Sequence, residues 1–276
     1  MAEGRLYVCA TPIGNLGDVS ERLRRTLTEV DAVYAEDTRR VAKLLAHLGV
    51  EVEVRSLFSG NEKSRSDELI SRLESGSRVA LVSDAGIPAI SDPGAWVVSL
   101  AHEKGIPVTV IPGPSSVLTA LALSGFPADR FVFEGFLPRK GKDRSTRLAG
   151  LASEDRTAVV FASPRRLGDD LAAMLGVMGP GRRVAVTREL TKLHEEVWVG
   201  SLADAVERWR GEVKGEVTIV VAPRVTHPGK DLDGAVSTAR ALVEAGESVS
   251  EAARRVAEET GVSRRVIYEA LVADQG

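Results

Sequence analysis

The chain is poor in aromatic residues and has only one cysteine. Phe, Trp and Tyr make up 4% of its 276 residues, so the core is expected to rest on Ala, Val, Leu and Ile. One cysteine, Cys9, excludes an intramolecular disulfide, which suits a reducing cytoplasm, and we expect a cytoplasmic protein. Cys9 lies in an apolar segment and is expected in the core.

Long apolar runs and an excess of one charge sign are also missing. No stretch reaches the roughly 18 apolar residues of a membrane-spanning helix, and the N-terminus lacks the pattern of a signal peptide. With 36 basic and 39 acidic residues the net charge is −3, so composition gives no sign of a nucleic-acid binder, although a local basic patch is compatible with it. The scattered histidines give no zinc-ligand spacing, and no metal is expected: His47, His102, His194 and His227.

What the first part of the chain does contain is an alternation of strand-like and helix-like segments. The predicted strands are Leu6–Ala10, Val52–Leu57, Val79–Ser83 and Val108–Ile111. The predicted helices are Ser20–Val30, Thr38–Leu48, Ser66–Ser75, Ala95–Lys104 and Val117–Ser124, the last stopped by Gly125. This alternation predicts βαβ units, a mostly parallel sheet and an α/β domain over residues 1–125.

The second part, residues 126–224, has more strands per helix, which predicts a mixed sheet. Its predicted strands are Phe131–Glu134, Thr157–Ala162, Val184–Arg188, Val197–Gly200 and Val217–Ala222. Its predicted helices are Ser145–Ala152, Leu167–Met178 and Leu202–Arg210.

A linker is predicted over Pro223–Asp233 because of its prolines and polar turns, and beyond it the pattern is purely helical. Ser248 and Glu251 form a capping-box pattern, and Gly261 is expected to stop that helix. With Ala235–Glu244, residues 233–276 predict a small all-α unit that resembles a helix-turn-helix.

Three loops rich in small residues, Gly or Pro follow strands of the first part: Thr11–Asp18, Ser83–Pro88 and Pro112–Ser116. In open α/β sheets, ligands bind at the carboxyl edge of the strands. The loops therefore predict a small-molecule site. No G-x-G-x-x-G or G-x-x-x-x-G-K-[ST] pattern is present, which argues against a dinucleotide fold and a P-loop NTPase.

A family resemblance rests on motifs in a fixed order. These are TPIGNLGD (Thr11–Asp18), AEDTRR (Ala35–Arg40), NE (Asn61–Glu62), VSDAGIPAISDPG (Val82–Gly94), PGPSS (Pro112–Ser116), EGFLPRK (Glu134–Lys140) and RELTK (Arg188–Lys192). From Leu6 to about Ala222 the chain resembles the bacterial 16S rRNA cytidine 2′-O-methyltransferases, a branch of the tetrapyrrole-methylase superfamily. The chain departs from that pattern at two places. Phe58-Ser59-Gly60 stands where many members have histidines. Ala162–Arg166 lacks both the glutamate and the histidine that many members have in that motif.

The resemblance implies a two-domain enzyme that binds S-adenosylmethionine in the cleft between its domains. Carried over by motif, the cofactor contacts are Pro12, Ile13, Gly14, Asp84, Ala85, Gly86, Ile87, Pro88, Ser115, Ser116, Leu137, Thr191, Glu216, Val217 and Thr218. It also implies methylation of a cytidine ribose near the decoding centre, 16S rRNA or the 30S subunit as partner, and a homodimer.

A ribose hydroxyl needs a base, or cations that stabilise its alkoxide, before it attacks. The catalytic candidates lie in family motifs at strand ends: Asp37, Arg39, Glu189 and Lys192. Each has a structural alternative. Asp37 suits the N-cap of the following helix, and Arg39 and Lys192 suit contacts with RNA phosphates.

Two further aspartates have mainly structural interpretations. Asp84 is expected either to accept hydrogen bonds from cofactor hydroxyls or to brace its own turn as an Asx motif, with the second favoured. Asp92 precedes Pro93 and is expected to cap a helix there.

RNA binding requires local positive charge, and one loop provides it. The RNA-binding candidates are Arg139, Lys140, Lys142, Arg144 and Arg147, with a solubilising loop as the alternative. The tail, by contrast, has six basic and nine acidic residues over positions 225–276, which favours an RNA, ribosome or dimer contact over DNA reading.

Two alternative functions stay open at this point. One is a corrin or porphyrin C-methyltransferase, although the first loop here is TPIGNLGD and not the usual G-x-G-P-G-D. The other is a helix-turn-helix regulator that retains a non-catalytic methylase domain.

Overall fold

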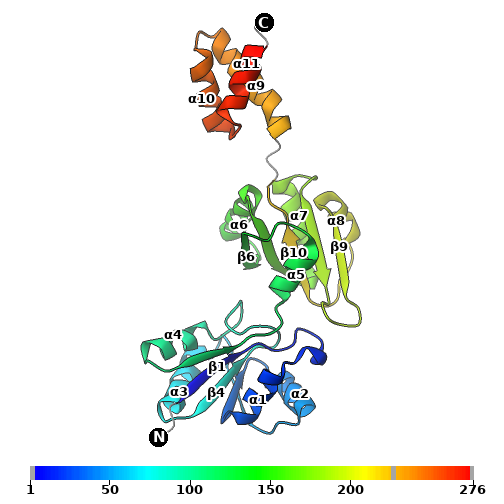
Figure 1. The fold of residues 1–276 in the computed structure, drawn as a ribbon. Helices are drawn as coiled ribbons and strands as arrows, with labels where there is room; N and C mark the ends of the chain where they lie inside the picture. The colour runs from blue at the N-terminus through cyan, green and yellow to red at the C-terminus, as the bar shows by residue number, and fades with distance from the viewer. Residues whose placement is uncertain (1–3, 225–227, 274–276) are drawn as a thin grey trace. The chain divides into compact units, whose positions relative to one another are not determined.

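The computed structural model describes residues 4–224 and 228–273. Their contacts divide the chain into two compact units, Met1–Pro223 and Arg224–Gly276 (Figure 1). The first unit contains two five-stranded sheets, and the elements described in the second are all helices. Within the described ranges, no helix has both the length and the apolar character needed to cross a bilayer.

The first sheet, predicted to be mostly parallel, is parallel in all of its strand pairs. Its order is β3 (Glu53–Ser56), β2 (Ala32–Ala35), β4 (Arg78–Val82), β1 (Arg5–Cys9) and β5 (Val108–Ile111). Helices α1 (Glu21–Glu29), α2 (Thr38–Leu48), α3 (Glu62–Glu74) and α4 (Ala95–Glu103) connect these strands. Successive residues of β4 alternate between two apolar cores: Val79 and Leu81 join one, and Ala80 and Val82 join the other.

Strand β2 was not predicted from the sequence. Its four residues are all buried, and it pairs with both β3 and β4 near the middle of the sheet. A four-residue strand flanked by Asp31 and Glu36 leaves too short an apolar run to be recognised by periodicity. Asp31 has a role in the pairing, because its carboxylate accepts a hydrogen bond from the Arg78 amide at 2.7 Å.

The second sheet is mixed, as predicted. Its order is β6 (Phe131–Phe136), β7 (Thr157–Ala162), β10 (Val217–Val221), β8 (Arg183–Arg188) and β9 (Glu196–Ser201). Only the β6–β7 pair is parallel. Its main core includes residues of α6 (Lys142–Ser153), α7 (Leu167–Met178) and α8 (Leu202–Arg208).

Helix α5 (Ser116–Ser124) joins the two halves of this unit. Its sequence position predicted that it belongs with the first sheet, but its Val117, Ala120 and Leu121 pack against Val159, Ala185 and Val220 of the second sheet. The helix thus follows β5 of one sheet and buries its apolar side on the other. Gly125 ends it in the left-handed conformation, with φ of 68°, as expected.

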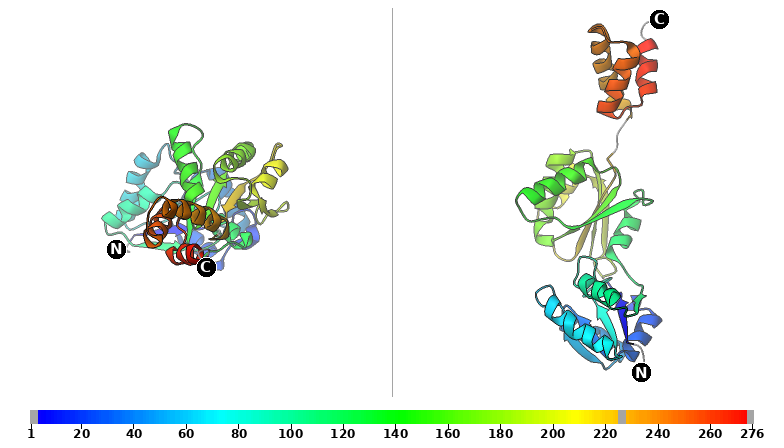
Figure 2. Two further views of the ribbon diagram at one scale, coloured as in Figure 1. Left: turned by 90° about the horizontal axis from the view of Figure 1, so that it is seen from above. Right: turned by 90° about the vertical axis from the view of Figure 1, so that its left-hand side faces the viewer.

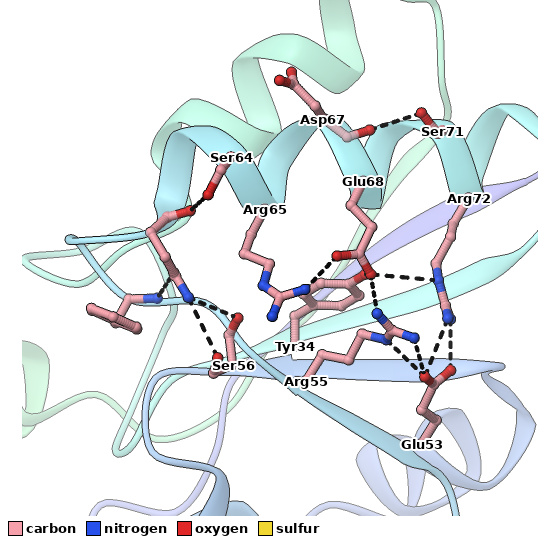
Figure 3. Close-up of polar contacts among 12 residues, drawn as sticks. Tyr34, Glu53, Arg55, Ser56, Ser64, Arg65, Asp67, Glu68, Ser71 and Arg72 are labelled. Atoms are coloured by element: carbon pink, nitrogen blue, oxygen red, sulfur yellow. Dashed lines mark hydrogen bonds and ion pairs between the residues drawn. The ribbon is translucent and has the colours of Figure 1, made fainter.

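The edge of the first sheet at β3 is fastened to α3 by a network of charged side chains (Figure 3). Glu53 and Glu68 lie between Arg55, Arg65 and Arg72. The buried Tyr34 hydroxyl donates to Glu68 at 3.1 Å. Burial, together with the Glu68 charge, raises the pKa of Tyr34 to about 12.

The second unit is a three-helix cluster of α9 (Pro228–Glu244), α10 (Val249–Thr260) and α11 (Arg264–Ala273), seen in orange to red in Figure 2. The linker prediction was too long, because α9 already begins at Pro228; residues 225–227 of that linker lie outside the described residues. The Ser248 hydroxyl accepts a hydrogen bond from the Glu251 amide, which confirms the cap. Gly261 ends α10 with φ of 73°, as expected.

Candidate active site

A cavity of about 730 Å³ opens within the first unit, lined by residues of both halves. All three strand-end loops reach it, through Ile13, through Asp84 to Ile87, and through Ser115 and Ser116. Its volume falls within the roughly 300–1,000 Å³ of small-molecule sites. The convergence predicted from the sequence is therefore present at the carboxyl edge of the first sheet.

Hydroxyl groups and backbone amides shape the loop that follows β4. Thr11 and Gly86 exchange two backbone hydrogen bonds, of 2.9 and 3.1 Å. The Ser83 hydroxyl donates to the Gly86 carbonyl at 3.0 Å, and the Thr11 hydroxyl donates to the Ser83 carbonyl at 3.1 Å. Gly86 itself has φ of 86°, a conformation that favours glycine. These bonds fix the turn from Asp84 to Ile87 against the first loop, at the wall of the cavity.

Asp84 does not brace this turn as an Asx motif. Its carboxylate instead accepts a hydrogen bond from the Asp37 amide at 3.0 Å and faces the Arg40 guanidinium at 3.5 Å. Arg40 also lies 3.9 Å from the Glu216 carboxylate of the second half. Asp84 therefore links two neighbouring strand ends, and Arg40 extends that link toward the other sheet.

Asp92 is not the helix cap that the sequence predicted. Helix α4 begins after Gly94, and Asp92 lines the cavity near the carboxylates of Glu36 and Asp84. Burial and these two negative charges raise the pKa of Asp92 to about 6. Burial and Asp84 also raise the pKa of Glu36. In the described part of the chain, no arginine or lysine lies within ion-pair distance of Asp92.

The loop that carries Asp92 has an unusual backbone. Ala89 and Ser91 both have positive φ, of 69° and 61°, which non-glycine residues rarely adopt. Glu62 at the start of α3 fastens the end of the loop, since its carboxylate accepts a hydrogen bond from the Gly94 amide at 2.8 Å. The Asn61–Glu62 motif thus contacts the loop that carries Asp92, although it does not line the cavity. Backbone strain of this kind often accompanies functional sites.

The four predicted catalytic residues lie outside the cavity lining. Asp37 caps α2 by accepting the Arg39 amide at 2.9 Å, and its carboxylate also holds the Arg39 guanidinium. The Arg39 side chain is 88% exposed. Lys192 lies 2.7 Å from Glu189 and 3.1 Å from Glu216, and these partners raise its pKa despite its burial. The hydrogen bonds therefore give these residues structural partners, and a catalytic role for them stays a prediction.

Ten of the fifteen predicted cofactor contacts line the cavity: Ile13, Asp84, Ala85, Gly86, Ile87, Ser115, Ser116, Glu216, Val217 and Thr218. The other five are Pro12, Gly14, Pro88, Leu137 and Thr191. Gly14 packs on the RELTK turn, where an added Cβ would lie 2.5 Å from Lys192 and 2.9 Å from Thr191. Leu137 is buried in the core of the second sheet.

Several residues that line the cavity were not predicted as site residues: Glu36, Arg40, Asp92, Phe131, Phe133, Phe136 and Phe161. Glu36 and Arg40 belong to the AEDTRR motif, beside the predicted Asp37 and Arg39. The phenylalanines could have been noticed because they are rare: the whole chain has only six, and three of them, Phe131, Phe133 and Phe136, lie within six residues of one another.

The predicted RNA-binding loop separates into two kinds of residue. Arg144 is half-buried and pairs at 2.8 Å with Asp170, whose side chain is 2% exposed. Arg147 pairs with Glu134. The other three, Arg139, Lys140 and Lys142, are exposed, and the described residues include no ion-pair partner for them. In the helical unit, the four arginines considered for nucleic acid have partners within that unit: Arg254, Arg255, Arg264 and Arg265.

The chain matches a known protein family over most of its first unit. Residues 5–206 match the model of the Tetrapyrrole (Corrin/Porphyrin) Methylases, which covers the first sheet and most of the second. The chain belongs to the tetrapyrrole methylase family. As a member of that family it is a methyltransferase, and the two-sheet α/β fold that the resemblance implied is confirmed.

Three relatives of this tetrapyrrole methylase illustrate the range of similarity. A Mycobacterium bovis protein named Ribosomal RNA small subunit methyltransferase I is 45% identical over 99% of this chain and 96% of its own. A protein of the same name from Escherichia coli O157:H7 is 38% identical, over 100% of this chain and 97% of its own. The Thermus thermophilus uroporphyrin-III C-methyltransferase, solved in complex with S-adenosyl homocysteine, shares the fold with a TM-score of 0.57 at 20% identity, covering 79% and 97% of the two chains.

Proposed function

We propose that this protein transfers a methyl group from S-adenosylmethionine to the 2′-hydroxyl of a cytidine ribose in small-subunit rRNA, near the decoding centre. The observation that carries the proposal is the cavity at the strand ends, built by the three loops in a chain that is 38–45% identical to proteins named for rRNA methylation. The 16S rRNA within the 30S subunit is the proposed partner, and a homodimer is the proposed assembly.

The cavity suits S-adenosylmethionine in charge and in shape. The cofactor has positively charged sulfonium and ammonium groups, and the cavity offers the carboxylates of Glu36, Asp84 and Asp92 on one wall. Its remaining lining is largely apolar and includes the turn at Gly86. We propose that the turn from Asp84 to Ile87, with Ser115 and Ser116, holds the cofactor.

When bound there, S-adenosylmethionine supplies an already electrophilic methyl group, so the protein needs mainly to position the hydroxyl and to accept its proton. Asp92 is the best-placed group for that second task. It lines the cavity, and its pKa of about 6 leaves it ionised but moderately basic near neutral pH. Glu36 and Asp84 face it, and Arg40 and Glu216 are the other charged groups of the lining.

The roles of the remaining predicted residues follow from their positions. Glu189 and Lys192 hold the turn that backs Gly14, so we propose that they position the first loop. Arg39, Arg139, Lys140 and Lys142 are exposed and suit contacts with RNA phosphates. Arg144 and Arg147, which have carboxylate partners, are expected to contribute less.

Methyl transfer to purified 30S subunits tests the proposal. Subunits from a strain that lacks the homologous enzyme are incubated with the full-length protein and cofactor labelled in its methyl group, and the rRNA is digested to nucleosides. The expected product is labelled 2′-O-methylcytidine. Label in a base, or label only in an added corrin or porphyrin, contradicts the proposal. Full-length protein that transfers no label contradicts it as well.

The same assay tests the proton acceptor. Asp92→Asn is expected to lower the rate of transfer by about 100-fold or more, because a positioned base contributes on that scale. The wild-type rate is expected to rise with pH up to about 6 and then level off. Asp129→Asn, which changes an exposed aspartate, is the control and should leave the rate unchanged. An Asp92→Asn variant with full activity would rule out this role.

A further inference from the structure

The phenylalanines of this chain are concentrated around one cavity. The chain has six, and four of them line the cavity described above: Phe131, Phe133, Phe136 and Phe161. All four belong to β6 and β7 of the second sheet. Among the described residues, the first half lines the same cavity with carboxylates, hydroxyls, one arginine and aliphatic side chains, but with no aromatic ring. The rings therefore form one wall of distinct chemistry.

A β-bulge explains how three of these rings come from one strand. In a regular strand, residues 131 and 133 share a face and residue 136 lies on the other. In β6 the register with β7 shifts between Phe133 and Gly135, so that Phe136 pairs with Phe161. The shift places Phe136 on the face of Phe131 and Phe133, as their common place in the cavity lining requires. Bulges are frequent beside active sites because they redirect a side chain in this way.

Gly135 makes the bulge possible. Its φ is 60°, in the left-handed region that favours glycine. An added Cβ there would lie 3.1 Å from the hydroxyl of Ser91, which belongs to the strained loop that carries Asp92. The bulge that turns Phe136 toward the cavity is therefore also the point at which β6 meets that loop.

Phe136 is held in place but left uncovered. Its ring centre lies 5.4 Å from that of Phe161, which in turn meets Phe133 edge to face at 5.0 Å. Phe136 nevertheless remains 58% exposed. A supported ring that faces a cavity offers a flat apolar surface to whatever enters it. Among the aromatic residues named as exposed in the described part of the chain, Phe136 has the largest exposed fraction, and it lines the cavity.

We propose that Phe136, supported by Phe161, is a stacking platform for the base of the nucleotide that is methylated. This inference rests on the proposed function, because it takes RNA as the substrate. A nucleotide must leave its stack before an enzyme can reach it in a cavity, and extruded bases are held between aromatic and apolar side chains. Bases of RNA loops also stack on phenylalanine.

The stacking role predicts a particular ranking of variants. Loss of an aromatic platform weakens nucleic-acid binding by roughly 5- to 150-fold per base. Phe136→Ala and Phe136→Leu are expected to raise the KM for 30S subunits about 10-fold or more, whereas Phe136→Tyr should stay within about twofold of wild type. Leucine preserves apolar volume without a π-face, so the Leu and Tyr variants separate stacking from simple apolar contact.

Two controls separate loss of base stacking from a general loss of aromatic surface and from loss of cofactor binding. Phe58→Ala removes another exposed phenylalanine, 44% exposed and outside the cavity lining, and should leave the KM unchanged. Calorimetric titration with S-adenosylhomocysteine should give the same Kd for Phe136→Ala as for wild type. Thermal unfolding of each variant confirms that it is folded.

The other possible results contradict either the stacking platform or the proposed function. An unchanged KM for Phe136→Ala, a Leu variant equal to wild type, or a loss confined to S-adenosylhomocysteine binding contradicts the platform. Wild-type protein that binds 30S subunits without methylating them contradicts the proposed function alone, and the platform is then judged from the binding constants of the variants. Wild-type protein that does not bind 30S subunits contradicts both.

Discussion

Asp92 in the first half and Asp170 in the second have opposite charged surroundings. Asp170 has a side chain that is 2% exposed and is held by Arg144 at 2.8 Å and by Arg166 at 3.3 Å. Asp92 lines a cavity, and the charges that act on it most are the carboxylates of Glu36 and Asp84. The first arrangement neutralises the aspartate, whereas the second leaves Asp92 beside two carboxylates, of which Asp84 faces Arg40 at 3.5 Å.

The difference suggests different purposes. A paired and buried carboxylate fixes α6, η2 (Pro164–Arg166) and α7 to one another, and removal of one partner leaves an uncompensated charge. An unpaired carboxylate among others is costly to ionise and contributes nothing to folding at neutral pH, but it suits proton transfer or a cationic ligand. The strained loop that presents Asp92 agrees with this interpretation.

The largest effect is expected where the paired aspartate loses its partner. Arg144→Ala should lower the free energy of unfolding by about 3 kcal/mol, because Arg166 alone remains beside the Asp170 carboxylate. Denaturant titration measures this. Arg139→Ala, in the same basic loop but exposed, should change stability by less than about 0.5 kcal/mol. Equal losses in the two variants would show that Asp170 is not the important partner.

A change of opposite sign is expected at Asp92. Asp92→Asn should raise the free energy of unfolding at pH 7.5 by roughly 1–2 kcal/mol, because it removes the charge that the fold disfavours. The pKa is raised in the folded state, so the wild-type group stabilises the protein at low pH and loses that contribution as the pH rises through about 6. The gain from asparagine should therefore vanish below about pH 4. Asp170→Asn is the matched control and should lower the free energy of unfolding. A loss of stability in both variants would show that the two aspartates do not differ in this way.

The smallest effect concerns the contact between the two halves. Gly135→Ala and Gly49→Ala both place a Cβ on a residue with φ near 60°, which costs about 1 kcal/mol. Only at Gly135 does the new atom meet a neighbour, the Ser91 hydroxyl at 3.1 Å. Gly135→Ala should therefore cost a few tenths of a kcal/mol more in thermal unfolding, and it alone should slow methyl transfer. Identical behaviour of the two variants would show that the bulge and the loop are independent.

Much of the fold could be predicted because it depends on local patterns. The βαβ alternation, the mixed second sheet, the caps at Asp37 and Ser248 and the stop at Gly125 all follow from periodicity and from residue chemistry. Strand β2 was missed because four residues are too few to show a period, although the neighbouring strands bury all of them.

The site was predictable only in part. The three strand-end loops converge because parallel strands end at one edge of a sheet, a consequence of topology that the alternating pattern already fixes. Asp92 could not be assigned, since its interpretation as a cap depended on where α4 begins, and the helix starts after Gly94. Arg144 looked like an RNA contact until its buried partner Asp170 was seen, 26 residues further along the chain.

The sequence by itself determined the family, the order of the elements and the edge of the sheet where ligands enter. Only the tertiary structure decided which charged side chains have ion-pair partners and which do not, because that depends on distances between residues far apart in the chain. It also decided that scarce phenylalanines gather on one wall. A bulge of one residue in β6 changes which face Phe136 occupies, and that change depends on pairing with β7 and on the space beside Ser91.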